Sequence, residues 1–185
     1  MSLVRPWRVL SEQVVVERRW LRLREQRVEL PNGHEIDEFH LLEGPDWAGV
    51  LALTEQNDVV MVRQYRHGLG RGSLELPAGV IEPDESDLFA AQRELLEETG
   101  YASDDWHALS VVSTEPARSS VHAHFFVARG ARRIGDSTPE QTELLQIELW
   151  PGKSFGKLID TGEICHGVQI GAILLAARRG FIELG

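Results

Sequence analysis

The feature that most constrains this chain is a segment of 23 residues, 79–101, in which glycine and charged residues recur at fixed distances. The pattern consists of two glycines and five charged residues, namely Gly79, Glu85, Arg93, Glu94, Glu97, Glu98 and Gly100. At roughly 6–7% usage per residue type, seven such matches arise by chance at about one start site in 10^8. The spacing therefore indicates a single functional element.

The second half of this segment is predicted to form a helix. At about 100° per residue, Leu88, Phe89, Ala91, Leu95 and Leu96 fall on one arc, and Glu94, Glu97 and Glu98 fall on the opposite side. Asp84 or Ser86 is suited to cap the start of the helix, and Gly100 is suited to end it.

Three carboxylates this close together repel one another, and a divalent cation removes that cost. Oxygen ligands suit Mg²⁺ or Mn²⁺, which often bridge carboxylates and substrate phosphates. Taken alone, the hexamer that starts at Arg93 is also typical of a solvated helix face with an Arg93–Glu97 ion pair. The flanking glycines and Glu85 favour a catalytic metal site.

The segment resembles the Nudix box, with Tyr101 in place of the final bulky aliphatic residue. The resemblance implies a loop–helix–loop and Mg²⁺-dependent hydrolysis of a nucleoside diphosphate linked to another moiety. It implies that Glu94 and Glu98 are the main metal ligands, with Glu97 beside them and a backbone carbonyl near Ala78. Arg93 then orients the carboxylates, and Glu85 supports them.

Flanking residues resemble the ADP-ribose pyrophosphatase branch of that family. The resemblance lies in the segments 62–66 and 75–79 and in Pro116. It implies ADP-ribose or a related nucleotide sugar as substrate, and a homodimer. The run after Pro116 departs from the branch, and there Arg118 either contacts a different sugar or a phosphate, or belongs to an ordinary turn.

Further site residues are expected on the same grounds. The resemblance implies a catalytic base in the loop before the last strand, where Glu143 fits best and Glu140 is the alternative; a box glutamate is a third option. Arg66 is suited to grip the diphosphate, or forms a surface ion pair. Glu75 structures the floor of the site or merely ends a strand. Trp7, Trp20 or Trp47 stacks on a base, or packs in a core or interface.

Alternating apolar residues predict the strands of the chain. Residues 12–43 are expected to form an antiparallel unit with a hairpin at Asn32-Gly33. Further strands are predicted at 50–53, 59–65, 109–114, 121–129 and 144–150, and a helix at 167–179. The order of elements predicts an α/β fold, an α/β/α sandwich with a mixed sheet. We expect an N-terminal β unit at 1–45, serving dimerisation, and a Nudix hydrolase domain at 46–185.

Composition limits the partners. The net charge of −10 and the lack of a basic run argue against nucleic acid. No apolar run reaches membrane-spanning length, no signal-peptide pattern is found, and the single Cys165 suits a reducing cytoplasm. The expected function is Mg²⁺-dependent hydrolysis of ADP-ribose. The alternatives are a hydrolase of another nucleotide sugar, such as GDP-mannose, and a non-catalytic nucleotide-sugar sensor.

Overall fold

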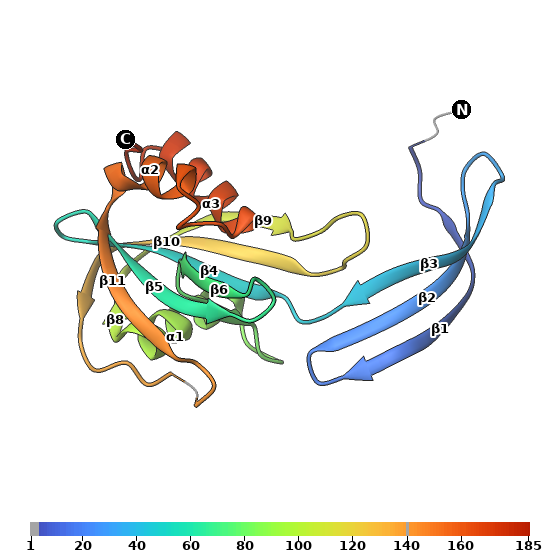
Figure 1. Ribbon diagram of the computed structural model, residues 1–185, viewed down its shortest axis with the longest axis horizontal. Coiled ribbons are helices and arrows are strands. Elements are labelled where there is room, and N and C mark those ends of the chain that lie inside the picture. Colours follow the sequence, from blue (N-terminus) through green and yellow to red (C-terminus); the bar gives the residue numbers. More distant parts are fainter. Residues whose placement is uncertain (1–3, 140) are drawn as a thin grey trace. The chain divides into compact units, whose positions relative to one another are not determined.

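The structure, a computed structural model, describes residues 4–139 and 141–185 and divides the chain into two compact units (Figure 1). The first unit contains the residues up to 45 together with 113–122. The second unit contains 46–112 and 123–185. The region predicted to bind metal therefore lies entirely in the second unit.

The first unit is built on a three-stranded antiparallel sheet, as predicted. Its strands are β1 (Arg8–Arg18), β2 (Leu21–Glu29) and β3 (Glu35–Glu43), in the order β1-β2-β3. Gly33 has a φ of 85° in the turn between β2 and β3, a backbone conformation that glycine adopts without strain. Strand β1 begins four residues before the predicted start at 12. Cross-strand ion pairs, such as Arg24 with Glu12, stabilise the pairing.

The second unit is built on an eight-stranded mixed sheet. Its central path runs β11-β5-β4-β10-β8, with β6 on β5, β7 on β4 and β9 on β10. The strands are β4 (Trp47–Thr54), β5 (Asp58–Arg66), β6 (Arg71–Glu75), β7 (Ala78–Val80), β8 (Tyr101–Ala102), β9 (Asp105–Ser113), β10 (His122–Arg133) and β11 (Leu145–Pro151). Strands β4 and β10 are parallel, and β4 is antiparallel to β5 and β7.

Helices cover both faces of this sheet, which confirms the predicted sandwich. They are α1 (Asp87–Thr99), α2 (Phe155–Asp160) and α3 (Gly167–Arg178), with a 3-10 turn at Gly152–Ser154. Strand β4 divides its side chains between two cores, as the period of two requires. Leu51 and Leu53 belong to the core that contains α2 and α3 residues, and Val50 and Ala52 belong to the core that contains α1 residues.

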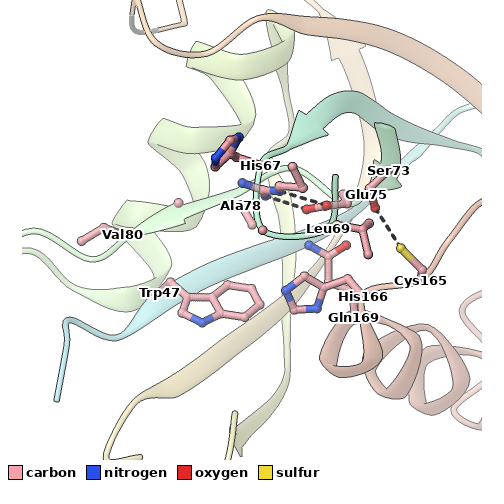
Figure 2. A pocket seen from close by; sticks show the side chains of 13 residues that line it. Trp47, His67, Leu69, Ser73, Glu75, Ala78, Val80, Cys165, His166 and Gln169 are labelled. Carbon is pink, nitrogen blue, oxygen red and sulfur yellow. Dashed lines mark hydrogen bonds and ion pairs between the residues drawn. The ribbon is translucent and has the colours of Figure 1, made fainter. Parts of the chain in front are cut away.

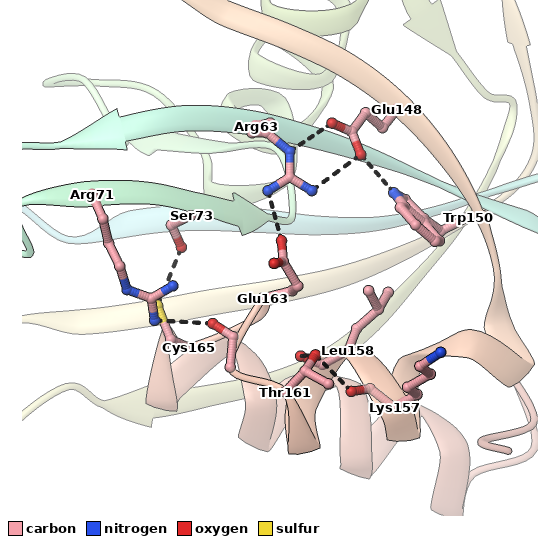
Figure 3. Close-up of polar contacts among 11 residues, drawn as sticks. Arg63, Arg71, Ser73, Glu148, Trp150, Lys157, Leu158, Thr161, Glu163 and Cys165 are labelled. Carbon is pink, nitrogen blue, oxygen red and sulfur yellow. Dashed lines mark hydrogen bonds and ion pairs between the residues drawn. The ribbon is translucent and has the colours of Figure 1, made fainter.

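Strand β11 is held to the sheet by a charged cluster as well as by its ladder (Figure 3). Arg63 on β5 donates from Nε to Glu148 Oε1 at 2.6 Å and from Nη1 to Glu163 Oε2 at 2.8 Å. Trp150 Nε1 donates to the same Glu148 carboxylate at 2.8 Å. The hydrogen bonds with Arg63 lower the pKa of Glu148.

Several short elements were not predicted, namely β6, β7, β8 and α2. They have two to six residues each, too few for a hydrophobic period to be recognised. The strand predicted at 109–114 begins earlier, at Asp105. Within residues 4–139 and 141–185, no helix has both the length and the apolar character needed to cross a membrane.

Candidate active site

Helix α1 carries most of the charged residues of the box, and its two ends are capped as the sequence indicates. The Ser86 side chain accepts a hydrogen bond from the Phe89 N–H at 3.2 Å. Gly100 has a φ of 73° and donates its N–H to the Leu96 carbonyl at 2.8 Å. Of the two predicted N-caps, Ser86 is therefore the one in use.

The glutamates of α1 differ sharply in exposure. Glu94 and Glu98 are buried, with 8% and 2% of their surface exposed, whereas the Glu97 side chain is 46% exposed. The apolar arc is only partly buried, because Phe89 and Leu96 are 59% and 40% exposed. The helix therefore buries two acidic residues and exposes two large apolar ones.

Strand β7, which precedes the helix, lies over the buried carboxylates. The Ala78 N–H donates to Glu98 Oε2 at 3.0 Å. A Cβ added at Gly79 would overlap the Glu94 carboxylate. Glycine at this position therefore lets the backbone approach Glu94 more closely than any other residue could.

Arg93 connects the other acidic residues of the box. Its guanidinium donates to both oxygens of Glu85, at 2.8 and 3.0 Å. It also donates to Glu94 Oε1 at 2.7 Å, to Glu97 Oε2 at 3.1 Å and to the Val80 carbonyl at 2.9 Å. The guanidinium therefore fixes the directions of three carboxylates, and the hydrogen bonds lower the pKa of Glu85.

Burial changes the acidity of the two central glutamates. It raises the pKa of Glu98 well above its usual range, and the nearby charges of Glu94 and Glu143 raise it further. It also raises the pKa of Glu94, against the opposing effect of Arg93. The charge of Glu143, the predicted base from a distant part of the chain, acts on both groups.

Arg66 and Glu75 form a two-bond ion pair at the same site. Arg66 Nε donates to Glu75 Oε1 at 3.0 Å, and Nη2 donates to Oε2 at 2.6 Å. Glu75 is 1% exposed; burial alone would raise its pKa, but Arg66 lowers it below the usual value. The pair lines one cavity with Ala78 and Gly79 (Figure 2), and the charge of Arg66 also acts on Glu98.

Two predicted residues are not joined to this group. Arg118 lies in the first unit, where it pairs with Glu115 at 2.7 Å, so its proposed contact with substrate stays a prediction. Glu140 lies outside the described residues.

The box residues fit a divalent cation. Two desolvated carboxylates with raised pKa values lie together, and a cation would remove the cost of ionising both. The potential ligands are Glu94, Glu98 and Glu97 with the Ala78 carbonyl. All are oxygen donors, which suit Mg²⁺ or Mn²⁺.

Sequence reasoning missed two residues near this site. His166 and Gln169, at the start of α3, line a cavity together with Arg66, Glu75, Ala78 and Gly79. A polar residue in the apolar run of α3 was a signal that could have identified Gln169. Nothing in the sequence around His166 links it to the box.

Comparison with known families matches both parts of the chain. Residues 45–159 match the NUDIX domain, and residues 7–42 match the nucleoside diphosphate sugar hydrolase N-terminal domain. The first match covers more than half of the chain.

Individual proteins agree with the family match. The methanol dehydrogenase activator of Bacillus methanolicus is 32% identical, over 77% of this chain and 78% of that protein. The ADP-ribose pyrophosphatase of Bacillus subtilis (strain 168) is 31% identical, over 74% of each chain. The ADP-ribose pyrophosphatase of Mycobacterium tuberculosis is 29% identical, over 87% of this chain and 79% of that protein. A crystal structure of an ADP compounds hydrolase has the same fold, with a TM-score of 0.85, 21% identity, and coverage of 97% of this chain and 96% of that one. The chain belongs to the Nudix family of hydrolases.

Proposed function

We propose that this Nudix hydrolase cleaves the diphosphate of ADP-ribose or a related nucleotide sugar, giving a nucleoside monophosphate and a sugar phosphate. The observation that carries the proposal is the buried pair Glu94 and Glu98 beneath Gly79, with the charge of Glu143 acting on both. The substrate class is supported by relatives named ADP-ribose pyrophosphatase and by the N-terminal family match.

Glu94 and Glu98 would hold Mg²⁺, or Mn²⁺ in its place, with Glu97 and the Ala78 carbonyl as further oxygen ligands. When bound, such a cation neutralises charge on the diphosphate and makes a water molecule more acidic. Arg93 would keep Glu94 and Glu97 in their binding orientation through its hydrogen bonds. Neutralising charge matters here because the chain has a net charge of −10.

Glu143 is the proposed general base. It would accept a proton from the water whose oxygen bonds to one phosphorus, while the bond from that phosphorus to the bridging oxygen breaks. ADP-ribose would then give AMP and ribose 5-phosphate. Glu140, which lies outside the described residues, and a box glutamate remain the alternatives for this role.

Arg66 would bind a substrate phosphate while Glu75 holds its guanidinium in place. Nε and one hydrogen on Nη2 point to Glu75, so the remaining N–H groups are the ones left for substrate. The Arg66 side chain is 44% exposed and the Glu75 side chain 2%, consistent with one residue at the surface of the site and the other beneath it.

A different sugar is the main alternative within this class. The run that contains Arg118 departs from the ADP-ribose branch, which motivates a preference for another substrate such as GDP-mannose. A non-catalytic sensor is disfavoured because all seven charged and glycine positions of the box are intact.

We also propose that residues 1–45 serve dimerisation and that 46–185 form the hydrolase domain, in a cytoplasmic protein. The first unit supports the dimer because strands β1 and β2 and the turn between them leave large apolar side chains 41–57% exposed: Val9, Val14, Val15, Trp20 and Leu21. Sedimentation equilibrium tests this, and a monomer at micromolar concentration would contradict it.

A substrate panel tests the proposed reaction. The protein is incubated with Mg²⁺ and ADP-ribose, GDP-mannose, UDP-glucose, NADH or diadenosine polyphosphates, and nucleoside monophosphate release is measured. Fastest release from ADP-ribose supports the stated substrate, and fastest release from GDP-mannose supports the alternative. Binding of these compounds without any release would instead support a sensor.

A further inference from the structure

A histidine on strand β10 lies between two aspartates at the ends of residues 81–86, the segment between β7 and α1 that we call the box loop. His124 Nδ1 lies 2.9 Å from Asp87 Oδ2, and His124 Nε2 lies 3.5 Å from Asp46 Oδ2. An ionised carboxylate accepts hydrogen bonds and does not donate them, so Nδ1 carries a hydrogen and donates it to Asp87. The His124 side chain is 19% exposed, which makes it the least exposed of the three.

The two aspartates mark the two ends of the box loop. The N–H of Ile81, the first loop residue, donates to the Asp46 backbone carbonyl at 3.0 Å. Asp87 is the first residue of α1 and follows the N-cap Ser86. Asp46 directly precedes β4, which pairs in parallel with β10, the strand of His124. One imidazole therefore contacts the residue that binds the start of the loop and the residue that follows its end.

The box loop is a compact turn that carries Glu85. The Glu82 N–H donates to Glu85 Oε2 at 2.9 Å, and the Glu85 N–H donates to the Glu82 carbonyl at 3.1 Å. Between them, Asp84 has a φ of 67°, a conformation that is costly for a residue with a side chain and persists where the surrounding structure fixes it. Because the turn is closed on itself, the position of Glu85 depends on how the two loop ends are held.

Glu85 in turn orients Arg93. Both carboxylate oxygens of Glu85 accept from the Arg93 guanidinium, at 2.8 and 3.0 Å. Such a two-bond contact fixes the plane of the guanidinium as well as its distance. The same guanidinium donates to Glu94 at 2.7 Å and to Glu97 at 3.1 Å. A shift of the box loop would therefore turn Arg93 away from these carboxylates.

We propose that His124 is a positioning residue for the reaction. By holding both ends of the box loop, it keeps Glu85, and through Glu85 the Arg93 guanidinium, in the arrangement that orients Glu94. The effect on turnover rests on the proposed function, whereas the effect on Arg93 does not. The competing interpretation is an ion-pair cluster that stabilises the fold without ordering Arg93.

The NMR signal of the Arg93 Nε–H group tests this role without metal or substrate, because this group donates to Glu85. The signal is assigned by its loss in Arg93→Lys. We expect His124→Leu to shift or broaden it. The control His107→Leu removes a contact of the same length, 2.9 Å, which His107 makes with Asp105 within β9, and should leave the signal unchanged. An unchanged Arg93 signal in a folded His124→Leu protein would overturn the proposal.

A conservative variant tests the contact with Asp87. The amide nitrogen of an asparagine side chain can take the place of Nδ1 and can donate a hydrogen bond. We expect His124→Asn to return the Arg93 signal most of the way to its wild-type position. If the signals of His124→Asn and His124→Leu coincide, the bond to Asp87 does not position the loop and the proposal fails.

A double-mutant cycle tests the effect on turnover. With Mg²⁺ and ADP-ribose, His124→Leu should lower kcat about tenfold, the smaller end of the range for residues that support metal ligands. In a Glu85→Gln protein, where the link to Arg93 is already broken, His124→Leu should lower kcat by less than about twofold. Equal factors in the two proteins would show that His124 acts independently of Glu85, which would overturn the proposal.

The two measurements also separate this inference from the proposed function. If the wild type does not cleave any compound of the substrate panel, and the Arg93 signal still responds to His124→Leu, the proposed function is rejected and the positioning of Arg93 is kept. If the wild type cleaves ADP-ribose and the Arg93 signal does not respond, the positioning role is rejected and the proposed function is kept.

Discussion

The side-chain amide of Gln169 bonds both backbone polar groups of Leu76. Gln169 Oε1 accepts from the Leu76 N–H at 2.8 Å, and Nε2 donates to the Leu76 carbonyl at 3.4 Å. The next two residues are also fixed, because the Pro77 carbonyl accepts from the Val50 N–H and the Ala78 N–H donates to Glu98. Helix α3 thereby holds the backbone that leads into strand β7, which lies against the buried glutamates.

Replacing Gln169 by leucine should therefore weaken both stability and metal binding. Gln169 is 1% exposed, so the change leaves two buried backbone groups of Leu76 unpaired, at a cost of about 1–3 kcal/mol. Urea unfolding with and without Mg²⁺ measures both effects, since bound metal stabilises the native state. Gln92→Leu, on the exposed face of α1, is the matched control. An unchanged response to Mg²⁺ would show that α3 does not position strand β7.

Gly79→Ala should reduce kcat sharply while leaving the protein folded. The added Cβ would overlap the Glu94 carboxylate, and displacement of a catalytic group by about 1 Å costs roughly 10²-fold in rate. Gly72→Ala is the control, because the nearest atom to its Cβ would be the Gln64 carbonyl oxygen at 3.9 Å. Equal kcat values for the two variants would contradict the close approach at Gly79.

Glu98→Gln should stabilise the metal-free protein at alkaline pH. The folded-state pKa of Glu98 lies above its ordinary value of 4.5, so the native state loses stability as the pH rises between these two values, and the penalty is complete above the higher one. Glutamine removes a penalty of about 1–3 kcal/mol and can still accept from the Ala78 N–H. Calorimetric melting in EDTA at pH 5 and pH 8 measures the difference. Glu97→Gln, at an exposed position, is the control and should change the stability of the metal-free protein little. If the Glu98→Gln protein is less stable than the wild type at pH 8, burial of the Glu98 charge is not the cause of the pH dependence.

Glu148→Gln should have the opposite dependence on pH. Arg63 lowers the folded-state pKa of Glu148 below 4.5, so its stabilisation is present above pH 4.5 and disappears as the pH falls through the folded-state value. We expect the free energy of unfolding of Glu148→Gln to be about 1–2 kcal/mol lower than that of the wild type at pH 7. This difference should shrink towards zero in strong acid. Denaturant unfolding across this range, with the exposed Glu55→Gln as control, tests it. A loss that does not depend on pH would indicate packing rather than charge.

The helix and its caps were predictable from sequence, and Ala91 and Leu95 of the apolar arc are buried, but the burial of the acidic side was not predictable. Spacing identifies α1, Ser86 and Gly100 because these signals are local. Periodicity places Glu94 and Glu98 opposite the apolar arc, yet the structure buries both and leaves Phe89 exposed. The reason is tertiary, because the approach of Gly79 covers the acidic side of the helix.

The cavity lined by Trp47 and His166 could not be predicted from the sequence. His166 lies far along the chain from Trp47, and no local pattern joins them, yet their rings are neighbours. Their proximity depends on the order of strands and on the packing of α3, which only the folded chain supplies. Glu143 was proposed as the base through family resemblance rather than through its surrounding sequence, and its charge acts on Glu98 in the folded chain.

The proposed metal site is tested by the Mg²⁺ dependence of AMP release from ADP-ribose, measured by phosphorus NMR for the wild type and for Glu98→Gln. We expect AMP release by the wild type to require Mg²⁺, and the folded Glu98→Gln protein to lose about 10²-fold or more in rate, as expected for loss of a metal ligand. Wild-type turnover in EDTA, or near-normal turnover by Glu98→Gln, would contradict a metal site built on the buried glutamates.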